Sequence, residues 1–482
     1  MRKQDWQPNR KSDIPIYIQI KEYIKEKIAI GEWPIGTRLP SQRKLALLFT
    51  VNRSTVVEAY EELIAEGLVE GIEGKETKVI NNTWNIVASA TPDWESYVKG
   101  STYKPNKVFI QRINEAEFLG ETIRMGTGEL SPSLLPIKKT NQILSSLTLS
   151  SEHLGYEEAK GSYPLRVAIC KYIRKSGVNA SPDSVLIVSG ALQAFQLIAN
   201  GLLKEKSSIL VESPSYLFSL NVFQSAKMNL IDVPISKIKN QVSILKTLKA
   251  QHQANLLYTI PTFHNPTGMT YSTEERKGIV DICRSNQLPI IEDDVYRELW
   301  IDSPPPQAMK SMDQTGNILY LGSASKILSP GLRIGWIVGP EVVVNQLADL
   351  KMQIDYGASS FSQAVLEKWF TNEDMYEEHV YHIRSELKQR RDFMMELLEK
   401  YFSRFASWEV PTGSFYVWVK FNKSISLSQL FDLALKQHIL INPGTVYREN
   451  GPSYIRLSYS YESLEKMEHG IKTLAKIVKG IR

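Results

Sequence analysis

Apolar residues at the start of the chain follow a helical period. Ile16, Ile20, Ile24 and Ile28 recur every four residues, which predicts an amphipathic helix. The segment GEWPIG begins at Gly31, and its glycines and proline are expected to end this helix.

Two short helices and a hairpin are predicted next. Ser41 is placed to cap a helix that ends near Phe49, and Asn52 is placed to cap another that stops at Gly67. The apolar face of the latter helix is expected to hold Val56, Val57, Tyr60, Leu63 and Ile64. The segment LVEGIEGKETKVI then alternates and turns like a two-stranded hairpin. This order of elements predicts a winged helix-turn-helix, an α+β domain.

The rest of the chain has a different pattern, in which short apolar runs alternate with longer, mostly helical stretches. The runs are SVLIVSG, SSILVES, ANLLYTIP, LPIIEDD, NILYLGS and IGWIVG. Such alternation predicts an α/β fold with a mainly parallel sheet flanked by helices. A long charged helix is expected over 374–401, and the tail, with FYVWVKF and YIRLSYS, has the pattern of a small α+β subdomain.

Weak periodicity separates these two parts. We expect a DNA-binding domain over 13–81, a linker over 82–107 and the α/β body over 108–482. The length of 482 residues agrees with more than one domain.

Composition and charge narrow the class of protein. Hydrophobic residues make up 43% and charged residues 23% of the chain, as in soluble globular proteins. The net charge of +5 is small for this length, so a nucleic-acid surface would have to be a local patch. Cys170 and Cys283 fit no metal-binding spacing, so no metal site is expected, and so few thiols suit a reducing compartment. The polar start and the lack of long apolar runs favour a cytoplasmic protein with no membrane partner.

Charges are distributed unevenly over the N-terminal part. The span 36–55 holds basic but no acidic residues, whereas 57–76 holds seven glutamates. The basic residues are Arg38, Arg43, Lys44 and Arg53. This polarity suits a recognition helix that enters the major groove by its first turn, where Arg53, Ser54 and Thr55 can contact bases or phosphates. A charged surface that binds protein is the alternative.

The segment GSASKILSPGLRIGW has the residues that an aldehyde cofactor with a phosphate requires. Lys326 stands among small and apolar residues, and such surroundings lower a lysine pKa and so favour the neutral amine that forms a Schiff base. Arg333 offers a forked, permanent cation for a phosphate, and Ser323 and Ser325 add hydroxyl donors.

Three other segments supply partners for a phosphate, a ring and a carboxylate. Gly190 follows a predicted strand and allows close approach to the first helical N–H groups, those of Ala191 and Leu192, which can bind phosphate. Tyr216 offers an aromatic face for stacking on a ring. Arg456 suits the carboxylate of an amino acid.

Two loops after predicted strands carry partners for a pyridine ring. Asp293 can hold a ring nitrogen protonated, so that the ring draws electrons, while Asn265 and Tyr296 can bond to a ring oxygen. The bond between Asn265 and Pro266 is a candidate cis peptide. Taken singly, each of these motifs also fits an ordinary turn or a structural ion pair.

The order of motifs in the N-terminal part resembles the GntR-type winged-helix domain. The matching segments are IPIYIQI, GTRLPSQRKLA, VNRSTVVEAYEEL and AEGLV. The resemblance implies that Arg43 and Arg53 contact DNA. Lys75, at the hairpin tip, is expected to reach the minor groove or the backbone, although GKET stands where many relatives have GSGT, which weakens this expectation.

The body resembles the fold-type I aminotransferases of the aspartate aminotransferase superfamily. The matching segments, in order, are LGYEEAKGSYPLR, SGALQA, ESPSY, HNPTG, EDDVY, SASKILSPGLRIGW and YIRLSYS. The resemblance implies that pyridoxal phosphate is the cofactor, that Lys326 carries it covalently, and that the residues named above hold its ring and phosphate. It also implies that Tyr156 reaches the site from the second subunit of a dimer.

A GntR-type head on an aminotransferase-like body resembles the MocR subfamily of transcription regulators. The resemblance implies a head-to-tail homodimer that binds operator DNA and senses the cofactor, alone or with an amino acid or other amine effector. Members that sense γ-aminobutyrate have an arginine two residues after the stacking tyrosine, where this chain has Phe218, so we do not expect that effector. An active aminotransferase that carries a DNA-binding head, and a degenerate scaffold, are the alternatives.

Overall fold

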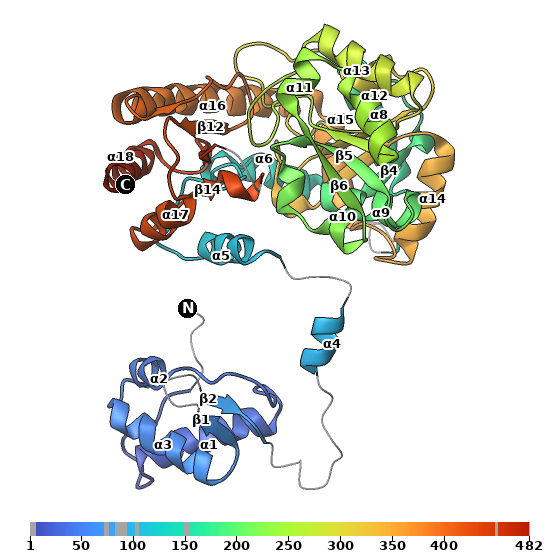
Figure 1. The fold of residues 1–482 in the computed structure, drawn as a ribbon. Coiled ribbons are helices and arrows are strands. Elements are labelled where there is room, and N and C mark those ends of the chain that lie inside the picture. The colour runs from blue at the N-terminus through green and yellow to red at the C-terminus, as the bar shows by residue number, and fades with distance from the viewer. Residues whose placement is uncertain are drawn as a thin grey trace. The chain divides into compact units, whose positions relative to one another are not determined.

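The computed structural model describes residues 6–71, 77–81, 94–101, 106–148, 155–448 and 452–481. The chain divides into two compact units, a head of residues 1–101 and a body of residues 102–482 (Figure 1). Among the helices that the structure describes, none is both long and apolar enough to cross a membrane.

The head is a three-helix unit with a two-stranded hairpin, as predicted (Figure 1). Its elements are α1 (Ile16–Ala29), α2 (Gln42–Phe49), α3 (Arg53–Ala65), β1 (Val69–Gly71) and β2 (Thr77–Val79), and a short further helix, α4 (Trp94–Gly100), follows the hairpin in sequence. Strands β1 and β2 pair antiparallel. The tip of the hairpin, with Lys75, lies outside the described residues.

The turn between α2 and α3 sets the position of α3. The Ser41 hydroxyl accepts a hydrogen bond from the Lys44 amide at 3.3 Å and so caps α2. Thr50 ends α2 in the left-handed conformation with a φ of 54°. Asn52 occupies the N-cap position of α3, but its side chain makes no capping bond, unlike the prediction.

Apolar side chains from all three helices form the core of the head. The repeating isoleucines of α1 that are fully buried, Ile20, Ile24 and Ile28, pack in one cluster with Phe49 and Tyr60. Val56 and Leu63 are buried as predicted, but Ile64 is 44% exposed, because the buried face of α3 is narrower than its apolar pattern.

A seven-stranded sheet organises the body, in the order β4-β10-β9-β8-β7-β5-β6. Its strands are β4 (Val185–Val188), β5 (Ser208–Ser213), β6 (Asn229–Pro234), β7 (Ala254–Thr259), β8 (Ile290–Asp293), β9 (Ile318–Ser323) and β10 (Gly335–Val338). Only β10 runs against its neighbours in this sheet, so the other six strands point the same way. Their carboxyl ends therefore meet along one edge, which is where open α/β sheets bind ligands.

Helices cover this sheet, as the pattern of alternating strands and helices predicted (Figure 1). They are α8 (Tyr163–Arg174), α9 (Ala191–Leu202), α10 (Val222–Ser225), α11 (Ile235–Asn240), α12 (Ile244–His252), α13 (Thr273–Ser285), α14 (Glu341–Met352) and α15 (Ser360–Thr371). Helix α9 contacts β4, β9 and β10, and α12 contacts β5 and β7.

The tail forms the small α+β subdomain that its pattern predicted. A four-stranded antiparallel sheet has the order β11-β12-β15-β14, with β11 (Ala406–Ser407), β12 (Tyr416–Phe421), β14 (Asn442–Pro443) and β15 (Tyr454–Ser458). Beside it, β3 (Ile123–Arg124) pairs in parallel with β13 (Ile439–Leu440). The helices α16 (Glu373–Phe402), α17 (Leu427–Lys436) and α18 (Leu464–Gly480) pack together here, and α5 (Val108–Glu117) and α6 (Ile137–Ser146) complete the body.

Candidate cofactor site and nucleic-acid interface

A cavity of about 390 Å³ lies at the carboxyl ends of the parallel strands. Most of the predicted cofactor residues line it: Ala191, Leu192, Tyr216, Asn265, Asp293, Tyr296, Ser323, Ser325, Lys326, Arg333 and Arg456. These residues lie far apart in the sequence. Most stand at or just after the end of a parallel strand, whereas Arg333 precedes the antiparallel β10 and Arg456 lies in β15 of the subdomain.

Lys326 extends its amine into this cavity. Its Nζ donates a hydrogen bond to the carbonyl oxygen of Gly128 at 2.7 Å. Burial lowers the pKa of Lys326 to about 8, so the neutral, nucleophilic amine is far more populated near neutral pH than for an ordinary lysine.

Asp293 ends β8 and presents one free oxygen to the cavity. The Tyr258 hydroxyl donates to its Oδ2 at 2.8 Å, whereas Oδ1 is buried and has no hydrogen-bond partner within the described ranges. Burial raises the pKa of Asp293 to about 6. A buried, half-satisfied carboxylate is ready to accept a hydrogen bond from a protonated ring nitrogen.

Asn265, Tyr296 and Arg456 form one hydrogen-bonded group. Asn265 Nδ2 donates to the Tyr296 hydroxyl at 3.2 Å, and Arg456 Nη1 donates to Asn265 Oδ1 at 2.8 Å. The Asn265–Pro266 peptide is cis, as expected. Arg456 also lies 3.9 Å over the Tyr416 ring, and its buried Nε has no partner among the described residues. The group thus places a cation and two polar side chains on one wall.

Arg333 and the start of α9 form the end of the cavity that suits a phosphate. Arg333 Nη2 donates to the Ser189 carbonyl at 3.0 Å. Gly190 precedes α9 with a φ of 89°, and a Cβ at this position would lie 2.7 Å from Arg333 Nη2. Only glycine therefore lets the guanidinium lie against the N-terminus of α9. The Ser325 amide bonds to the Ser323 hydroxyl at 3.1 Å beside them.

These features fit pyridoxal phosphate. The free Asp293 Oδ1 matches a protonated ring nitrogen, and the Lys326 amine matches an aldehyde. The Gly190 backbone and the guanidinium of Arg333 match a phosphate. No group of three or more His, Cys, Asp or Glu side chains within the described part of the chain is placed to hold a metal ion.

Two residues singled out from the sequence lie away from the cavity. Tyr156 is 86% exposed and contacts the Tyr356 ring at 4.9 Å instead of the cavity of its own chain. Phe218 packs, partly buried, against the core of the body. The place of Tyr156 in a second subunit stays a prediction.

The structure adds cavity residues that the motifs did not reveal. Tyr416 lies at the start of β12, and Asn442 and Tyr447 come from the segment around β14. Glu117 ends α5, accepts a hydrogen bond from the Thr127 hydroxyl at 3.0 Å, and has its pKa raised by burial. None of these residues follows a strand of the large sheet, so the sequence motifs at those strand ends did not predict them.

The head carries a basic concavity formed by the N-terminal arm, α2 and the start of α3. Arg10, Arg43 and Arg53 line it together with Thr55, and its volume is about 790 Å³. Arg10 was missed because it precedes every predicted element; its Nη2 donates to the Thr50 carbonyl at 2.5 Å.

Arg53 projects from the first turn of α3, where the sequence placed a DNA contact. Its Nη2 donates to Gln42 Oε1 at 3.4 Å, and none of the described carboxylates forms an ion pair with Arg53 or Arg43. The acidic residue Glu66, at the other end of α3, is paired with Lys21 at 3.0 Å and Lys25 at 2.9 Å. The positive potential is therefore concentrated at the N-terminal end of α3, which is the end that recognition helices present to DNA.

The remaining predicted DNA contacts have different positions. Ser54 lies beside Arg53 at the start of α3, and Arg38 lies opposite Lys78 in an isolated bridge next to the hairpin. Lys75 lies outside the described residues.

Both units match known families. A model of the aminotransferase class I and II family matches residues 121–474, and a model of the bacterial regulatory proteins of the gntR family matches residues 16–79.

Relatives with the same two-part arrangement extend over nearly the whole chain. The chain is 48% identical over 475 residues to YisV of Bacillus subtilis (strain 168), an uncharacterized HTH-type transcriptional regulator, and the match covers 98% of each chain. It is 36% identical over 447 residues to the HTH-type transcriptional regulator NorG of Staphylococcus aureus (strain N315), a match that covers 92% of this chain and 100% of NorG.

Solved aminotransferases share the fold of the body. A kynurenine aminotransferase of Pyrococcus horikoshii, in complex with PMP, aligns with a TM-score of 0.75 and 29% identity over 80% of this chain and 98% of that one. The α-aminoadipate aminotransferase LysN of Thermus thermophilus aligns with a TM-score of 0.70 and 25% identity over 83% and 98%. The chain therefore belongs to the aminotransferase class I and II family and joins it to a gntR-family head, the arrangement of the MocR-type transcriptional regulators.

Proposed function

We propose that this protein is a transcription regulator that binds operator DNA through its head and uses its body to sense pyridoxal phosphate, alone or with an amino compound. The observation that carries the proposal is a cofactor cavity with a complete set of polar partners in the same chain as a basic helix-turn-helix. Because the head acts on DNA, we place the protein in the cytoplasm.

Each cavity residue has a defined task in this proposal. The Lys326 amine holds the cofactor covalently, Asp293 accepts the ring N–H, and Asn265 and Tyr296 bond to the ring oxygen. Ser323, Ser325 and Arg333, with the amides that follow Gly190, bind the phosphate. When bound, the cofactor supplies an electron-withdrawing ring and an aldehyde that reacts with amines.

Arg456 determines which amines the cavity favours. Its guanidinium is buried beside Asn265 and retains an unpartnered Nε, so a carboxylate can displace part of its present bonding. With Phe218 packed into the core, no second arginine stands at that position for a ligand with a distal carboxylate. An α-amino acid with one carboxylate is thus the effector class that we propose.

Regulation requires that the occupied cavity favours one arrangement of the heads. A ligand shifts such an equilibrium only by its difference in affinity for the two states. A tenfold change in operator occupancy needs about 1.4 kcal/mol, which one additional charged hydrogen bond can supply. We further propose a head-to-tail homodimer, because an exposed Tyr156 is then free to enter the partner's cavity.

A quantitative DNA-binding assay tests the proposal. The full-length protein is titrated onto DNA from upstream of its own coding region, with and without pyridoxal phosphate, at fixed salt. We expect sequence-specific binding whose affinity changes when the cofactor is added. Binding that is equal on unrelated DNA of the same length contradicts the regulator role.

The second candidate function is an active aminotransferase. The cavity holds Lys326 with a lowered pKa, Asp293 for the ring nitrogen and Arg456 for a substrate carboxylate. Sustained conversion of an amino acid and a keto acid by the purified protein would favour it. Under our proposal, such turnover is absent or slow compared with effector binding.

A further inference from the structure

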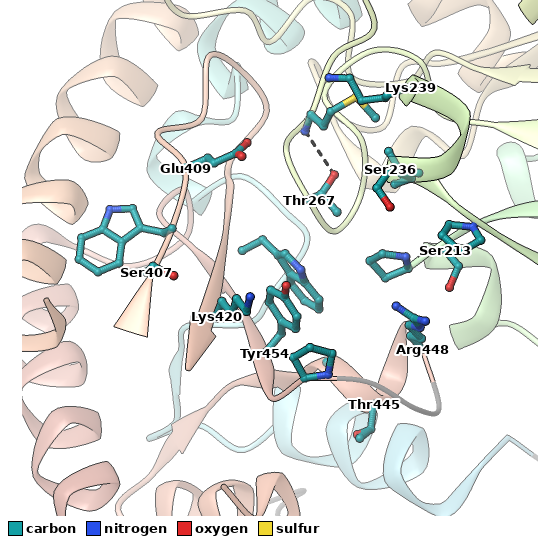
Figure 2. Close-up of a pocket in the computed structure, with 18 of the residues that line it drawn as sticks. Ser213, Ser236, Lys239, Thr267, Ser407, Glu409, Lys420, Thr445, Arg448 and Tyr454 are labelled. Atoms are coloured by element: carbon teal, nitrogen blue, oxygen red, sulfur yellow. Dashed lines mark hydrogen bonds between the residues drawn. The ribbon is translucent and has the colours of Figure 1, made fainter. Parts of the chain in front are cut away.

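The body contains a second and larger cleft, of about 740 Å³, between the large sheet and the subdomain (Figure 2). One wall comes from the end of β5, the start of α11 and the loop at Thr267. The other comes from β11, β12, β15 and the turn at Thr445. The residues that face this space share no position with the cofactor cavity.

Among the described residues that line this cleft, cations outnumber carboxylates. Figure 2 shows Lys239, Lys420 and Arg448 on its walls, together with Glu409. Lys239 lies 3.6 Å from Glu275, whereas no described carboxylate forms an ion pair with Lys420 or Arg448. Two exposed cations without an ion-pair partner among the described residues, one on β12 and one beyond Thr445, suit an anionic group.

An aromatic wall stands beside these cations. The rings of Trp418 and Tyr454 stack at 4.9 Å between centroids with an interplanar angle of 9°. Gly444 packs directly against them, because a Cβ there would lie 2.9 Å from the Tyr454 carbonyl oxygen and 3.2 Å from Trp418. A flat, fixed apolar surface next to a cation suits an aromatic ring more than a flexible aliphatic chain.

The second cleft and the cofactor cavity are neighbours, because four short segments contribute residues to both. The pairs, with the residue of the second cleft first, are Ser213 and Tyr216, Thr267 and Asn265, Thr445 and Tyr447, and Tyr454 and Arg456.

Direct contacts connect the two spaces through this shared wall. The Trp418 ring meets the Tyr447 ring edge-on at 5.7 Å, and the Arg456 guanidinium lies 5.1 Å from the same Tyr447 ring. The Ser215 amide donates to the Tyr447 carbonyl at 3.0 Å, which joins the large sheet to the subdomain at the wall. Tyr447 therefore contacts both Trp418 of the second cleft and Arg456 of the cofactor cavity, and it connects a ligand on Trp418 to Arg456.

We propose that this cleft is a second ligand site, which binds a small aromatic compound with one anionic group, and that its occupation changes the cofactor cavity. Lys420 and Arg448 bind the anion, and Trp418 with Tyr454 binds the ring. The site lies outside the Lys326 cavity, so its existence does not depend on the regulator role proposed above.

Calorimetric titration of the cofactor-loaded, full-length protein tests this site. The probes are phenyl phosphate and benzoate, which distinguish a phosphate from a carboxylate. Inorganic phosphate, which lacks the ring, and phenol, which lacks the anion, serve as half-ligands. We expect saturable binding of at least one aromatic anion below about 10 mM, and weaker binding of both half-ligands. The proposal is overturned if neither aromatic anion saturates the protein. It is also overturned if inorganic phosphate binds as tightly as phenyl phosphate.

Variants assign the binding to the cleft. Lys420→Ala combined with Arg448→Ala is expected to weaken the binding of the aromatic anion at least about tenfold, since both charged hydrogen bonds to the anion are lost. Lys423→Ala is the matched control, because Lys423 is exposed just beyond β12 and does not line the cleft. Equal affinities in the double variant and the wild type contradict the assignment.

The cofactor spectrum tests the coupling. Saturating aromatic anion is expected to shift the absorbance of the bound cofactor in the wild type and in Lys423→Ala, but not in the double variant at the same concentration. An unchanged wild-type spectrum at saturation overturns the coupling. Because these titrations contain no DNA, their failure leaves the regulator role intact, and a failure of DNA binding leaves the second site intact.

Discussion

Asp293 shows how a single residue combines an energetic cost with a function. Its carboxylate is buried, one oxygen is satisfied by Tyr258 and the other has no partner among the described residues. Burial raises its pKa to about 6, so ionisation at neutral pH destabilises the protein without its cofactor. Under the function proposed above, a ring N–H at Oδ1 would remove this cost, so Asp293 would make stability depend on cofactor occupancy.

The substitution Asp293→Asn separates these two effects. A folded-state pKa above the usual aspartate value means that stability falls as the pH rises through this range, and the neutral amide avoids that loss. We expect the cofactor-free variant to be more stable than the wild type at pH 7.5, by at most about 3 kcal/mol, and the gain to be about 1 kcal/mol smaller at pH 5.

Denaturant unfolding of both cofactor-free proteins at the two pH values measures the difference. The same variant is expected to bind pyridoxal phosphate more weakly. A variant that is less stable than the wild type at pH 7.5 would show that the Asp293 charge is compensated, contrary to the account above.

Lys326 makes a pH-dependent prediction of its own. Because its pKa is about 8, the rate of covalent cofactor attachment should rise between about pH 7 and pH 9 and then level off. Stopped-flow absorbance follows the rate, and borohydride reduction with mass spectrometry locates the adduct. Lys326→Ala should retain no reducible adduct; an adduct on another lysine in that variant would contradict the assignment.

The residues of the cofactor cavity were predicted from sequence where each stands at the end of a strand or just beyond it, as Asp293 and Lys326 do. Tyr416 and Glu117 could not be predicted in this way, because their place in the cavity depends on how the subdomain and α5 fold against the large sheet. Sequence periodicity carries no information on such long-range contacts.

At the scale of elements, α3 is placed by a short turn and differs in charge between its two ends. Its first turn holds Arg53 over a basic concavity, whereas Glu66 beyond its last turn is paired with two lysines of α1. The pattern of isoleucines, glycines and caps was sufficient to predict these helices. The exposure of Ile64 and the antiparallel direction of β10 were not predictable, because both depend on neighbouring elements.

Arg53→Ala tests the proposed role of α3 in DNA binding. Loss of a base or phosphate contact by this guanidinium should weaken operator binding by about 1–3 kcal/mol. Lys25→Ala, on α1 and paired with Glu66, is the control and should leave the affinity within about twofold, since exposed pairs contribute little. Fluorescence anisotropy at several salt concentrations measures both; equal losses in the two variants would contradict the orientation proposed for α3.

At the scale of the whole molecule, the two units of one chain must communicate for the protein to regulate transcription. The proposed dimer gives the body a way to report its state, because Tyr156 of one subunit would complete the cavity of the other. Each unit was predicted from sequence because its motifs are local; the head-to-tail arrangement of two chains was implied only by the family resemblance, and it stays a prediction.

Mixed dimers test whether Tyr156 acts across subunits. Lys326→Ala lacks the covalent adduct, and Tyr156→Ala should bind the cofactor weakly. After the two variants are unfolded together and refolded, a mixed dimer has one cavity with both residues intact if Tyr156 acts in the partner. We expect tight, reducible cofactor binding to return in the mixture; binding no better than the sum of the separate variants would show that Tyr156 acts in its own chain or not at all.

The most direct test of the central claim is quantitative DNA footprinting of the full-length protein upstream of its own coding region, with and without pyridoxal phosphate, for the wild type and Lys326→Ala. We expect a protected site in the wild type whose affinity or extent changes when the cofactor is added, and a site in Lys326→Ala that the cofactor does not change. Protection that is the same in all four conditions would contradict a cofactor-sensing role, and a region that neither protein protects in any condition would contradict DNA binding there.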